Sequence, residues 1–329
     1  MPRRLGIVGT MVWDRICARD GRAHPVEEWG GIAYALAALA AARPPEWELV
    51  PILKVGRDLA ERAGAFLSSL PGLDLGPGVR EVPEPNNRVE LRYTDRERRF
   101  ERLTGGVPPW AWEELRPLLD GFDALYINFI SGFEMELATA IRVRMAFSGP
   151  IYCDLHSLML GVGPDGQRIP RPLADWPEWL RCFDIVQLNE DELGTLSGAW
   201  GDPWRFAAEV VGPDLKLLLV TLGERGAAYF ASPAFTESPL SWRRDGLGLR
   251  RPLAAPGPVR SERLVPPQVA IDGDPTGCGD VWGGTAFIRL LAGDRLRDAV
   301  EAANAAAARN ARHRGATGLH LYLQGRIGT

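Results

Sequence analysis

Short, continuously apolar runs alternate along this chain with longer segments of helical pattern, and this alternation restricts the fold more than any other feature. Strands that are apolar at successive positions are covered on both faces, which is typical of a parallel sheet between layers of helices. The sequence therefore predicts an α/β fold with a mostly parallel central sheet flanked by helices. The apolar runs are LGIVG (5–9), ELVPILKVG (48–56), ALYINFI (124–130), IYCDL (151–155), DIVQLN (184–189) and LKLLLVTLG (215–223).

One segment departs from this pattern. In NRVELRYTDRERRFERL (87–103), apolar and polar residues alternate on both sides of a turn near 94–96. A period of two with one polar face indicates a half-exposed hairpin, which does not belong in a buried parallel sheet. We expect a small β lid formed from about 10–30 and 85–105, within a single domain that spans 1–329.

A second segment, 232–267, is rich in Pro, Gly and Arg and shows little periodicity. We expect a long surface loop there.

Composition and charge exclude several classes of function. A net charge of −4 provides no basic surface for nucleic acid. The longest apolar run, 32–42, is too short to span a bilayer, and no N-terminal stretch resembles a signal peptide. The four cysteines are scattered without a CxxC pair, which argues against a disulfide framework or a zinc site. We therefore expect a cytoplasmic protein that acts on a small molecule, without nucleic-acid or membrane partners.

The stretch DPTGCGDVWGG (274–284) has the composition of an anion site. A helical pattern follows Gly277, Cys278 and Gly279 directly, so their amides should point out of a helix N-terminus toward a bound anion. Asp280 would repel that anion unless it has chemistry to perform, such as taking a proton from a hydroxyl that attacks a phosphoryl group. The alternative is that Asp280 is a helix N-terminal acid favoured by the helix dipole.

Two familiar phosphate-binding motifs do not account for this turn. A P-loop requires GK[ST], and no lysine lies nearby. A dinucleotide fingerprint follows the first strand of a fold, whereas this turn comes near the C-terminus.

The stretch D-P-T-G-C-G-D resembles the second signature of the ribokinase-like (PfkB-type) carbohydrate kinases, D-T-x-G-A-G-D, with Cys278 in place of the usual Ala. Other segments are similar to further motifs of this family in the same order, so the resemblance extends from about residue 5 to about 320. They are VGRD (55–58) for V-G-x-D, LNEDE (188–192) for N-x-x-E, VTLGERGA (220–227) for T-x-G-x-x-G, and EAANAAAARNARHRGAT (301–317) for the helix that closes over adenine.

The resemblance implies a catalytic centre and a magnesium site. Asp280 would be the base that activates the acceptor hydroxyl, and the amides of Gly277, Cys278 and Gly279 would bind the γ-phosphoryl group of ATP. Asn189 and Glu192 would organise Mg²⁺, partly through water. Their local sequence equally fits a helix N-cap followed by an acid in the first turn.

The resemblance also implies the nucleotide contacts. Thr221, Gly223 and Gly226 would line the ATP site, although T-L-G-E-R-G is by itself typical of a turn between a strand and a hairpin. Asn304 would lie by the adenine. Asp274 would help to hold a monovalent cation such as K⁺, as the equivalent loop does in some members.

The acceptor side departs from the family. GTMVWD (9–14) keeps the G-x-x-x-x-D that would place Asp14 on acceptor hydroxyls, and Gly30 and Gly31 keep the glycine loop near the sugar. Ala35 stands where the family usually has a sugar-binding Asn, and Val12 replaces a polar residue, so we expect a less polar pocket.

Other residues near the acceptor site remain ambiguous. Trp13, Trp29 and Tyr34 either line this pocket or belong to the core. CDLHS (153–157) resembles the family's D-P-N segment, with Asp154 retained and His156 in place of Asn.

The leading hypothesis is an ATP- and Mg²⁺-dependent kinase for a hydroxyl of a sugar or sugar derivative. The resemblance implies a lid that closes on the substrate and can pair with a second subunit to form a homodimer. Arginines of the 87–103 hairpin either meet a substrate phosphate or form a solvated charged face. Alternatives are a nucleoside kinase and a non-catalytic regulatory protein that retains the fold; another α/β nucleotide hydrolase would leave the lid-like hairpin without an explanation.

Overall fold

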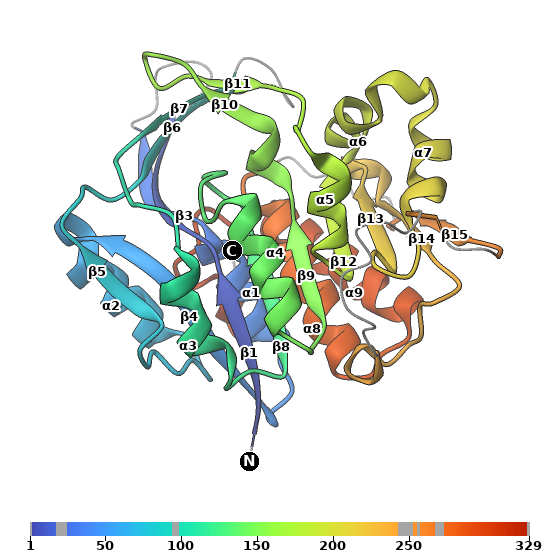
Figure 1. The fold of residues 1–329 in the computed structure, drawn as a ribbon. Coiled ribbons are helices and arrows are strands. Elements are labelled where there is room, and N and C mark those ends of the chain that lie inside the picture. Colours follow the sequence, from blue (N-terminus) through green and yellow to red (C-terminus); the bar gives the residue numbers. More distant parts are fainter. Residues whose placement is uncertain are drawn as a thin grey trace.

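A sheet of mostly parallel strands lies at the centre of the molecule (Figure 1). The computed structural model describes residues 2–17, 25–93, 99–242, 253–254, 257–266 and 273–327. The strands of this sheet are β1 (Arg3–Val8), β4 (Trp47–Gly56), β5 (Val79–Val82), β8 (Ala124–Asn128), β9 (Ile151–Asp154), β12 (Ile185–Asn189), β13 (Leu217–Thr221), β14 (Ala227–Ala231) and β15 (Arg260–Leu264).

The strand order is β15-β14-β13-β12-β9-β8-β1-β4-β5. From β13 to β5 every neighbouring pair is parallel, whereas β14 is antiparallel to β13 and β15 is antiparallel to β14. Each of the six apolar runs overlaps one of the parallel strands. The predicted α/β fold with a mostly parallel central sheet is therefore confirmed.

Helices cover both faces of this sheet. One layer contains α1 (Ile32–Ala42), α2 (Ala60–Ser69), α8 (Cys278–Leu291), α9 (Leu296–Asn310) and α10 (Leu319–Leu323). The other contains α3 (Trp112–Leu119), α4 (Leu137–Ala146), α5 (Trp176–Arg181), α6 (Glu190–Ser197) and α7 (Pro203–Val210). Short 3₁₀ turns connect some of these elements: η1 (Arg57–Leu59), η2 (His156–Met159), η3 (Gly198–Trp200), η4 (Gly223–Arg225) and η5 (Pro239–Ser241).

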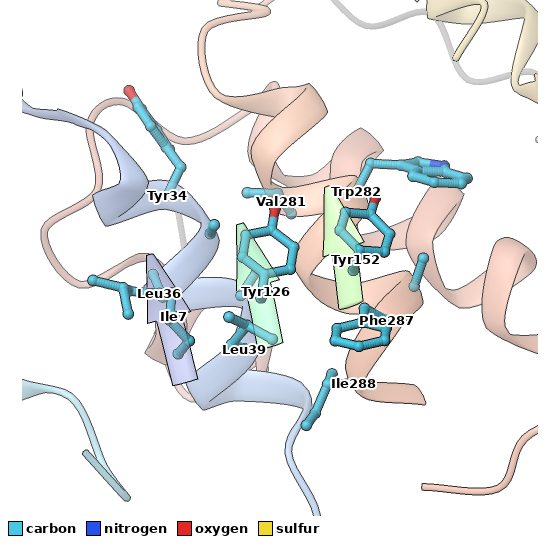
Figure 2. Packing of buried hydrophobic residues seen from close by; sticks show 14 of the residues in the cluster. Ile7, Tyr34, Leu36, Leu39, Tyr126, Tyr152, Val281, Trp282, Phe287 and Ile288 are labelled. Atoms are coloured by element: carbon cyan, nitrogen blue, oxygen red, sulfur yellow. The ribbon is translucent and has the colours of Figure 1, made fainter. Parts of the chain in front are cut away.

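The two-sided burial of the strands explains their continuous apolar runs. Leu125 and Ile127 of β8 pack into the core under α3 to α7, while Tyr126 between them points into the opposite core. Figure 2 shows Tyr126 in that second core with Phe287 of α8 and Leu39 of α1. Helix α1 is apolar on all sides, which is typical of a helix buried between other elements.

A second, smaller sheet lies over the carboxyl ends of the central strands (Figure 1). It has the order β3-β2-β6-β7 and lies within the two segments expected to form a lid, about 10–30 and 85–105. We call this sheet the lid sheet. The turn expected near 94–96 lies outside the described residues. The strands are β2 (Met11–Cys17), β3 (Val26–Gly31), β6 (Arg88–Tyr93) and β7 (Arg99–Thr104).

A short hairpin that the sequence did not predict extends the lid sheet. It consists of β10 (Leu160–Val162) and β11 (Arg168–Pro170) and lies between β9 and α5 in the chain. Its turn contacts β7, where Leu103 N donates to Gly166 O at 2.8 Å and Arg102 Nε donates to Asp165 O at 2.7 Å. The body of the molecule is therefore hydrogen-bonded to one edge of the lid sheet.

The prediction of a loop over 232–267 was wrong in part. Strand β15 lies within this range and pairs with β14 at the edge of the central sheet. Its sequence, RSERL, is mostly exposed and polar, so an edge strand of this kind lacks the apolar pattern by which buried strands are found. Within the described ranges, no helix combines the length and apolar character needed to cross a membrane.

Candidate active site

Polar side chains gather where the parallel strands end, on the side that faces the lid sheet. Asn128 ends β8, Asp154 ends β9, Asn189 ends β12 and Thr221 ends β13. The register sets Asn128 opposite Asp154, and Asn189 opposite Thr221. The carboxyl edge of an open parallel sheet is where ligands bind in α/β folds, so these residues mark the candidate site.

The glycine turn leads into helix α8 at this edge. Gly277 is the N-cap of α8, with φ of +75°, and no side chain caps the helix. A Cβ at this position would lie 2.3 Å from Cγ of Tyr34, so the backbone conformation and the aromatic ring both require glycine. The turn is thus a backbone surface at a helix N-terminus, as an anion site requires.

Cys278 has its own environment within this turn. Its amide donates to the carbonyl of Pro275 at 3.1 Å, and its thiol lies 3.4 Å from the carbonyl of Ala307 on α9. Burial raises the pKa of the Cys278 thiol to about 11. The sulfur therefore packs against α9 as a protonated thiol, in a place where alanine would leave space.

Asp280 lies in the first turn of α8 and is held from the sheet. Asn128 Nδ2 donates to Asp280 Oδ1 at 2.7 Å, and the Asn128 side chain is completely buried. This bond joins residues that are 152 positions apart in the chain. Asp280 is therefore oriented by the sheet as well as favoured by the helix dipole. Asn128 was not predicted as a site residue, because its only signal in the sequence is an amide at the end of a buried apolar run.

A buried polar layer supports α8 from below. Gln187 Nε2 donates to Asp154 Oδ2 at 2.8 Å and to the carbonyl of Gly279 at 3.0 Å, and Tyr152 donates to Gln187 Oε1. A Cβ at Gly283 would lie 2.6 Å from the Tyr152 hydroxyl, so glycine lets α8 approach this layer. Burial, followed by the charges of Glu192 and Asp280, raises the pKa of Asp154 well above its usual range.

Asn189 and Glu192 form a capping box at the start of α6. Asn189 Oδ1 accepts from the Glu192 amide, and Glu192 Oε2 accepts from the Asn189 amide, both at 2.8 Å. Glu192 Oε1 lies 2.8 Å from His156 Nδ1. Burial acts to lower the pKa of His156, but its hydrogen bond to Glu192 and the charges of Glu192 and Asp154 outweigh burial and raise it to about 9. His156 is thus a cation at neutral pH, paired with Glu192.

The donors at this edge fit a magnesium ion that is bound mainly by phosphates. Across the part of the chain that the structure describes, no three or more His, Cys, Asp or Glu side chains cluster as they would in an all-protein metal site. Mg²⁺ usually keeps several waters and takes one or two protein carboxylates together with substrate phosphates. Glu192, with Asn189 beside it, is a donor set of that size.

The residues expected around the nucleotide lie at the same edge. Gly223 and Gly226 have φ of +59° and +88° in the tight turn between β13 and β14. Asn304 on α9 is buried; its Oδ1 accepts from Trp282 Nε1 at 2.8 Å, and its Nδ2 donates to the carbonyl of Leu264 at 3.3 Å. This amide therefore joins α9 to α8 and β15. Asp274 Oδ1 accepts from the amide and the hydroxyl of Thr276, at 2.9 and 2.6 Å, and so shapes the glycine turn.

On the acceptor side, the lid sheet brings Asp14 of β2 next to Gly30 of β3. A Cβ at Gly30 would lie 1.7 Å from Asp14 Oδ2, so glycine makes room for this buried carboxylate. Gly31 has φ of +58° and is the N-cap of α1.

The residues that depart from the family lie in the core. Ala35 and Val12 are at most 1% exposed. Trp29 and Tyr34 are also buried, whereas Trp13 is partly exposed and packs edge-to-face on Trp29 with ring centroids 5.1 Å apart. The burial of Trp29 and Tyr34 favours the alternative in which they belong to the core rather than line the pocket.

Two arginines of the 87–103 hairpin contact the protein itself. Arg88 forms an ion pair with Asp58 at 2.6 Å, and Arg102 donates to the backbone of Asp165. Arg96 and Arg98 lie outside the described residues. The contacts of Arg88 and Arg102 favour the alternative in which the arginines of this hairpin form a solvated charged face.

Comparison with known proteins finds similarity at the level of structure. No protein-family model matches the chain, and no curated protein sequence matches it. Among solved structures, the ribokinase of Arabidopsis thaliana complexed with ribose and ATP is similar with a TM-score of 0.66 and 18% identity, over 100% of both chains. The Burkholderia thailandensis nucleoside kinase in complex with inosine has a TM-score of 0.69 and 16% identity, over 98% of this chain and 97% of that one.

A third similar structure is a pyrophosphate-dependent kinase in the ribokinase family, complexed with a pyrophosphate analog and myo-inositol. Its TM-score is 0.70 at 16% identity, over 98% of this chain and 100% of the other. Sequence identity in these three comparisons is low, but each covers nearly the whole of both chains, lid sheet included. The expectation drawn from the sequence motifs is confirmed at the level of architecture: this chain has the ribokinase fold.

Proposed function

We propose that this protein is an ATP- and Mg²⁺-dependent kinase that phosphorylates a hydroxyl of a sugar or sugar derivative. One observation carries the proposal: Asp280 lies directly after the Gly277–Gly279 turn and is hydrogen-bonded to Asn128 at the carboxyl edge of the sheet. A carboxylate beside an anion site has a chemical reason to be there if it accepts the proton of the attacking hydroxyl.

In this mechanism Asp280 takes the proton of the acceptor hydroxyl as its oxygen forms a bond to the γ-phosphorus. The bond between the γ-phosphorus and the bridging oxygen breaks, and ADP leaves. The amides of Gly277 and Gly279 stabilise the charge on the transferred group. The Cys278 amide would have to leave the Pro275 carbonyl to join them.

Mg²⁺, when bound, neutralises charge on the phosphates of ATP. Asn189 and Glu192 would hold it, partly through water. His156 keeps the Glu192 carboxylate in one orientation through the 2.8 Å contact. Thr221, Gly223 and Gly226 would line the nucleotide site.

Asn304 would lie near the adenine as a supporting residue, because its Oδ1 and Nδ2 atoms already have hydrogen-bond partners in the protein. Asp274 would add a carboxylate to a monovalent cation site for K⁺.

We further propose that Asp14, Gly30 and Gly31 contact the acceptor under the lid sheet. Closure of this sheet would exclude water, so that the phosphoryl group passes to the acceptor rather than to solvent. A homodimer through the lid sheet would have to use β3 for edge-to-edge pairing, because the β10–β11 hairpin already contacts the edge of β7.

The substitution Asp280→Asn tests the catalytic role. We expect kcat to fall by ~10²–10⁴, the range for loss of a general base, with ATP affinity nearly unchanged. The assay is ADP release with Mg·ATP across neutral sugars, sugar acids, sugar phosphates, inositols and nucleosides.

Asp298→Asn is the matched control, because Asp298 is an exposed acid in the first turn of α9 and has no part in the site. If both variants keep wild-type turnover, Asp280 is only a helix N-terminal acid. If no acceptor stimulates ADP release although ATP binds, the protein is a non-catalytic regulatory binder.

A further inference from the structure

A buried cation with unused hydrogen-bonding capacity lies in the β10–β11 hairpin. Arg168, the first residue of β11, is 8% exposed. Its Nη2 donates to the carbonyl of Ser157 at 3.4 Å, but Nη1 is buried and makes no hydrogen bond within the described residues. Burial lowers the pKa of Arg168, which reflects the energetic cost of keeping this charge away from water.

The strand register places Arg168 beside the lid sheet. Arg102 of β7 and Gln167 form an antiparallel bridge, so the next pair along the strands is Glu101 and Arg168. Residues that face each other across such a pair point to the same side of the sheet. Arg168 therefore continues a row that begins on the lid sheet.

That row leads to the acceptor carboxylate. Glu101 pairs with Leu91 of β6, and Leu91 pairs with Ile16 of β2, two residues from Asp14. Leu91 and Asp14 are 3% and 5% exposed, so this is the inner face of the lid sheet. Arg168 and Asp14 therefore lie on the same face of this extended sheet.

The guanidinium also lies against two residues that line a cavity. Its Cζ lies 5.8 Å from the Phe133 ring centroid, and a Cβ at Gly132 would lie 3.5 Å from Nη2. Gly132 and Phe133 also line a cavity of about 720 Å³, together with Leu103 and Leu158. This volume is sufficient for a sugar-sized molecule.

Two carboxylates, Glu101 opposite Arg168 in the register and the buried Glu134, act against burial on the pKa of Arg168. Neither accepts a hydrogen bond from Nη1. Glu134 Oε1 accepts from the Ser131 amide at 2.7 Å and from the Thr10 hydroxyl at 2.8 Å, and Oε2 accepts from the Gly132 amide at 3.0 Å. Burial raises the pKa of Glu134, which weakens it further as a counter-ion.

We propose that the acceptor carries an anionic group, a carboxylate or a phosphate, that Arg168 binds with its unused Nη1 donors. A planar guanidinium suits both groups because it can bind two of their oxygens at once. The proposal rests on the proposed kinase function and specifies its substrate class.

The experiment compares acceptors that share one carbon skeleton: the neutral sugar, its aldonic acid and its monophosphate. For each, kcat and KM are measured by ADP release, and binding is measured by calorimetry without ATP. The variants are Arg168→Gln, Arg168→Lys, which keeps the charge but loses the planar fork, and Arg116→Gln. Arg116 is an exposed arginine of α3 that does not line this cavity, and it serves as the control. Circular dichroism checks that each variant is folded.

We expect the wild type to prefer one of the two anionic acceptors. Arg168→Gln should weaken its binding by about 10- to 100-fold, the range for a lost hydrogen bond to a charged group, with a smaller loss in Arg168→Lys and none in Arg116→Gln. The aldonic acid and the monophosphate distinguish a carboxylate from a phosphate.

A wild-type preference for the neutral sugar overturns the proposal, whether or not Arg168→Gln folds. Equal losses of all three ligands in Arg168→Gln overturn it as well. The proposed kinase function fails separately, if anionic ligands bind through Arg168 but none of them stimulates ADP release.

Discussion

Asn128 illustrates how one residue can decide the chemistry of another. Its amide donates to Asp280 at 2.7 Å from a completely buried position at the end of β8. A hydrogen bond to a carboxylate from a rigid, desolvated donor fixes the orientation of that carboxylate and favours its charged form. The proposed base therefore depends on a positioning residue in the sheet.

Asn128→Leu should lower kcat by about 10- to 100-fold, because Asp280 loses a donor worth roughly 1.5–3 kcal/mol. A purely structural role of Asn128 would lower the free energy of unfolding without lowering the kcat of the folded variant. Steady-state kinetics and urea denaturation of the same variant separate the two cases.

The pKa of His156 predicts how the stability of the folded protein depends on pH. Its pKa is about 9 in the folded protein, against about 6.5 in an unfolded chain, so the folded state binds the proton more tightly. This contribution to stability is fully present below pH 6.5 and is lost as the pH rises through 9.

His156→Gln should therefore lower the free energy of unfolding more at pH 6 than at pH 10, as measured by urea denaturation. The same loss at both pH values would show that the ion pair with Glu192 does not hold the proton as described.

At the scale of elements, the start of α8 is the most constrained part of the fold. The Gly277 backbone has a left-handed conformation, and its α-carbon lies against the Tyr34 ring of α1. Two helices far apart in the sequence thus determine the shape of the anion turn together.

Gly277→Ala should lower the free energy of unfolding by more than the ~1–2 kcal/mol of left-handed strain, because the added methyl group also displaces the Tyr34 ring. It should also lower kcat, since the turn moves. Gly64→Ala is the control: nothing lies within 4 Å of a Cβ there, and the position is in the interior of α2. That variant should be more stable by roughly 0.5–1 kcal/mol. Equal effects of the two substitutions in chemical denaturation would contradict the argument.

At the scale of the whole molecule, the candidate site lies between two different sheets, the central sheet and the lid sheet. The carboxyl edge of the central sheet carries the residues proposed to bind phosphate, and the lid sheet, which contains Asp14, lies over it (Figure 1). The β10–β11 hairpin connects the body to the lid sheet on one side. A ligand bound between these parts would stabilise the assembled molecule as a whole.

Mg·ATP should therefore raise the Tm. At 100 times its Kd the expected gain is ~2.7 kcal/mol, which corresponds to an increase of several degrees for a chain of this size. Chelation of Mg²⁺ with EDTA should remove most of the increase, and Asp280→Asn should retain it. Differential scanning calorimetry with ATP and pyrophosphate in parallel identifies the phosphate donor; an increase with pyrophosphate alone would contradict the assignment of ATP.

The sequence alone was sufficient to predict those parts of the structure that depend on the residues of one segment. Continuous apolar runs such as ALYINFI and LKLLLVTLG predicted the parallel strands, because a strand that is buried on both faces has apolar side chains at successive positions. The turn at 277–279 predicted a helix N-terminus for the same reason: positive φ requires glycine at the position itself. An exposed edge strand such as β15 lacks this apolar pattern, so the prediction of a loop over 232–267 was wrong in part.

Only the tertiary structure decided which side chains support the proposed site. Asn128, Gln187 and Arg168 look ordinary in the sequence, because their importance comes from partners on other strands and helices. The capping box of Asn189 and Glu192 was foreseeable from its spacing, but the contact of Glu192 with His156 was not. Contacts of this kind depend on strand order and register, which are set by the packing of the whole molecule and leave no signal at any one position.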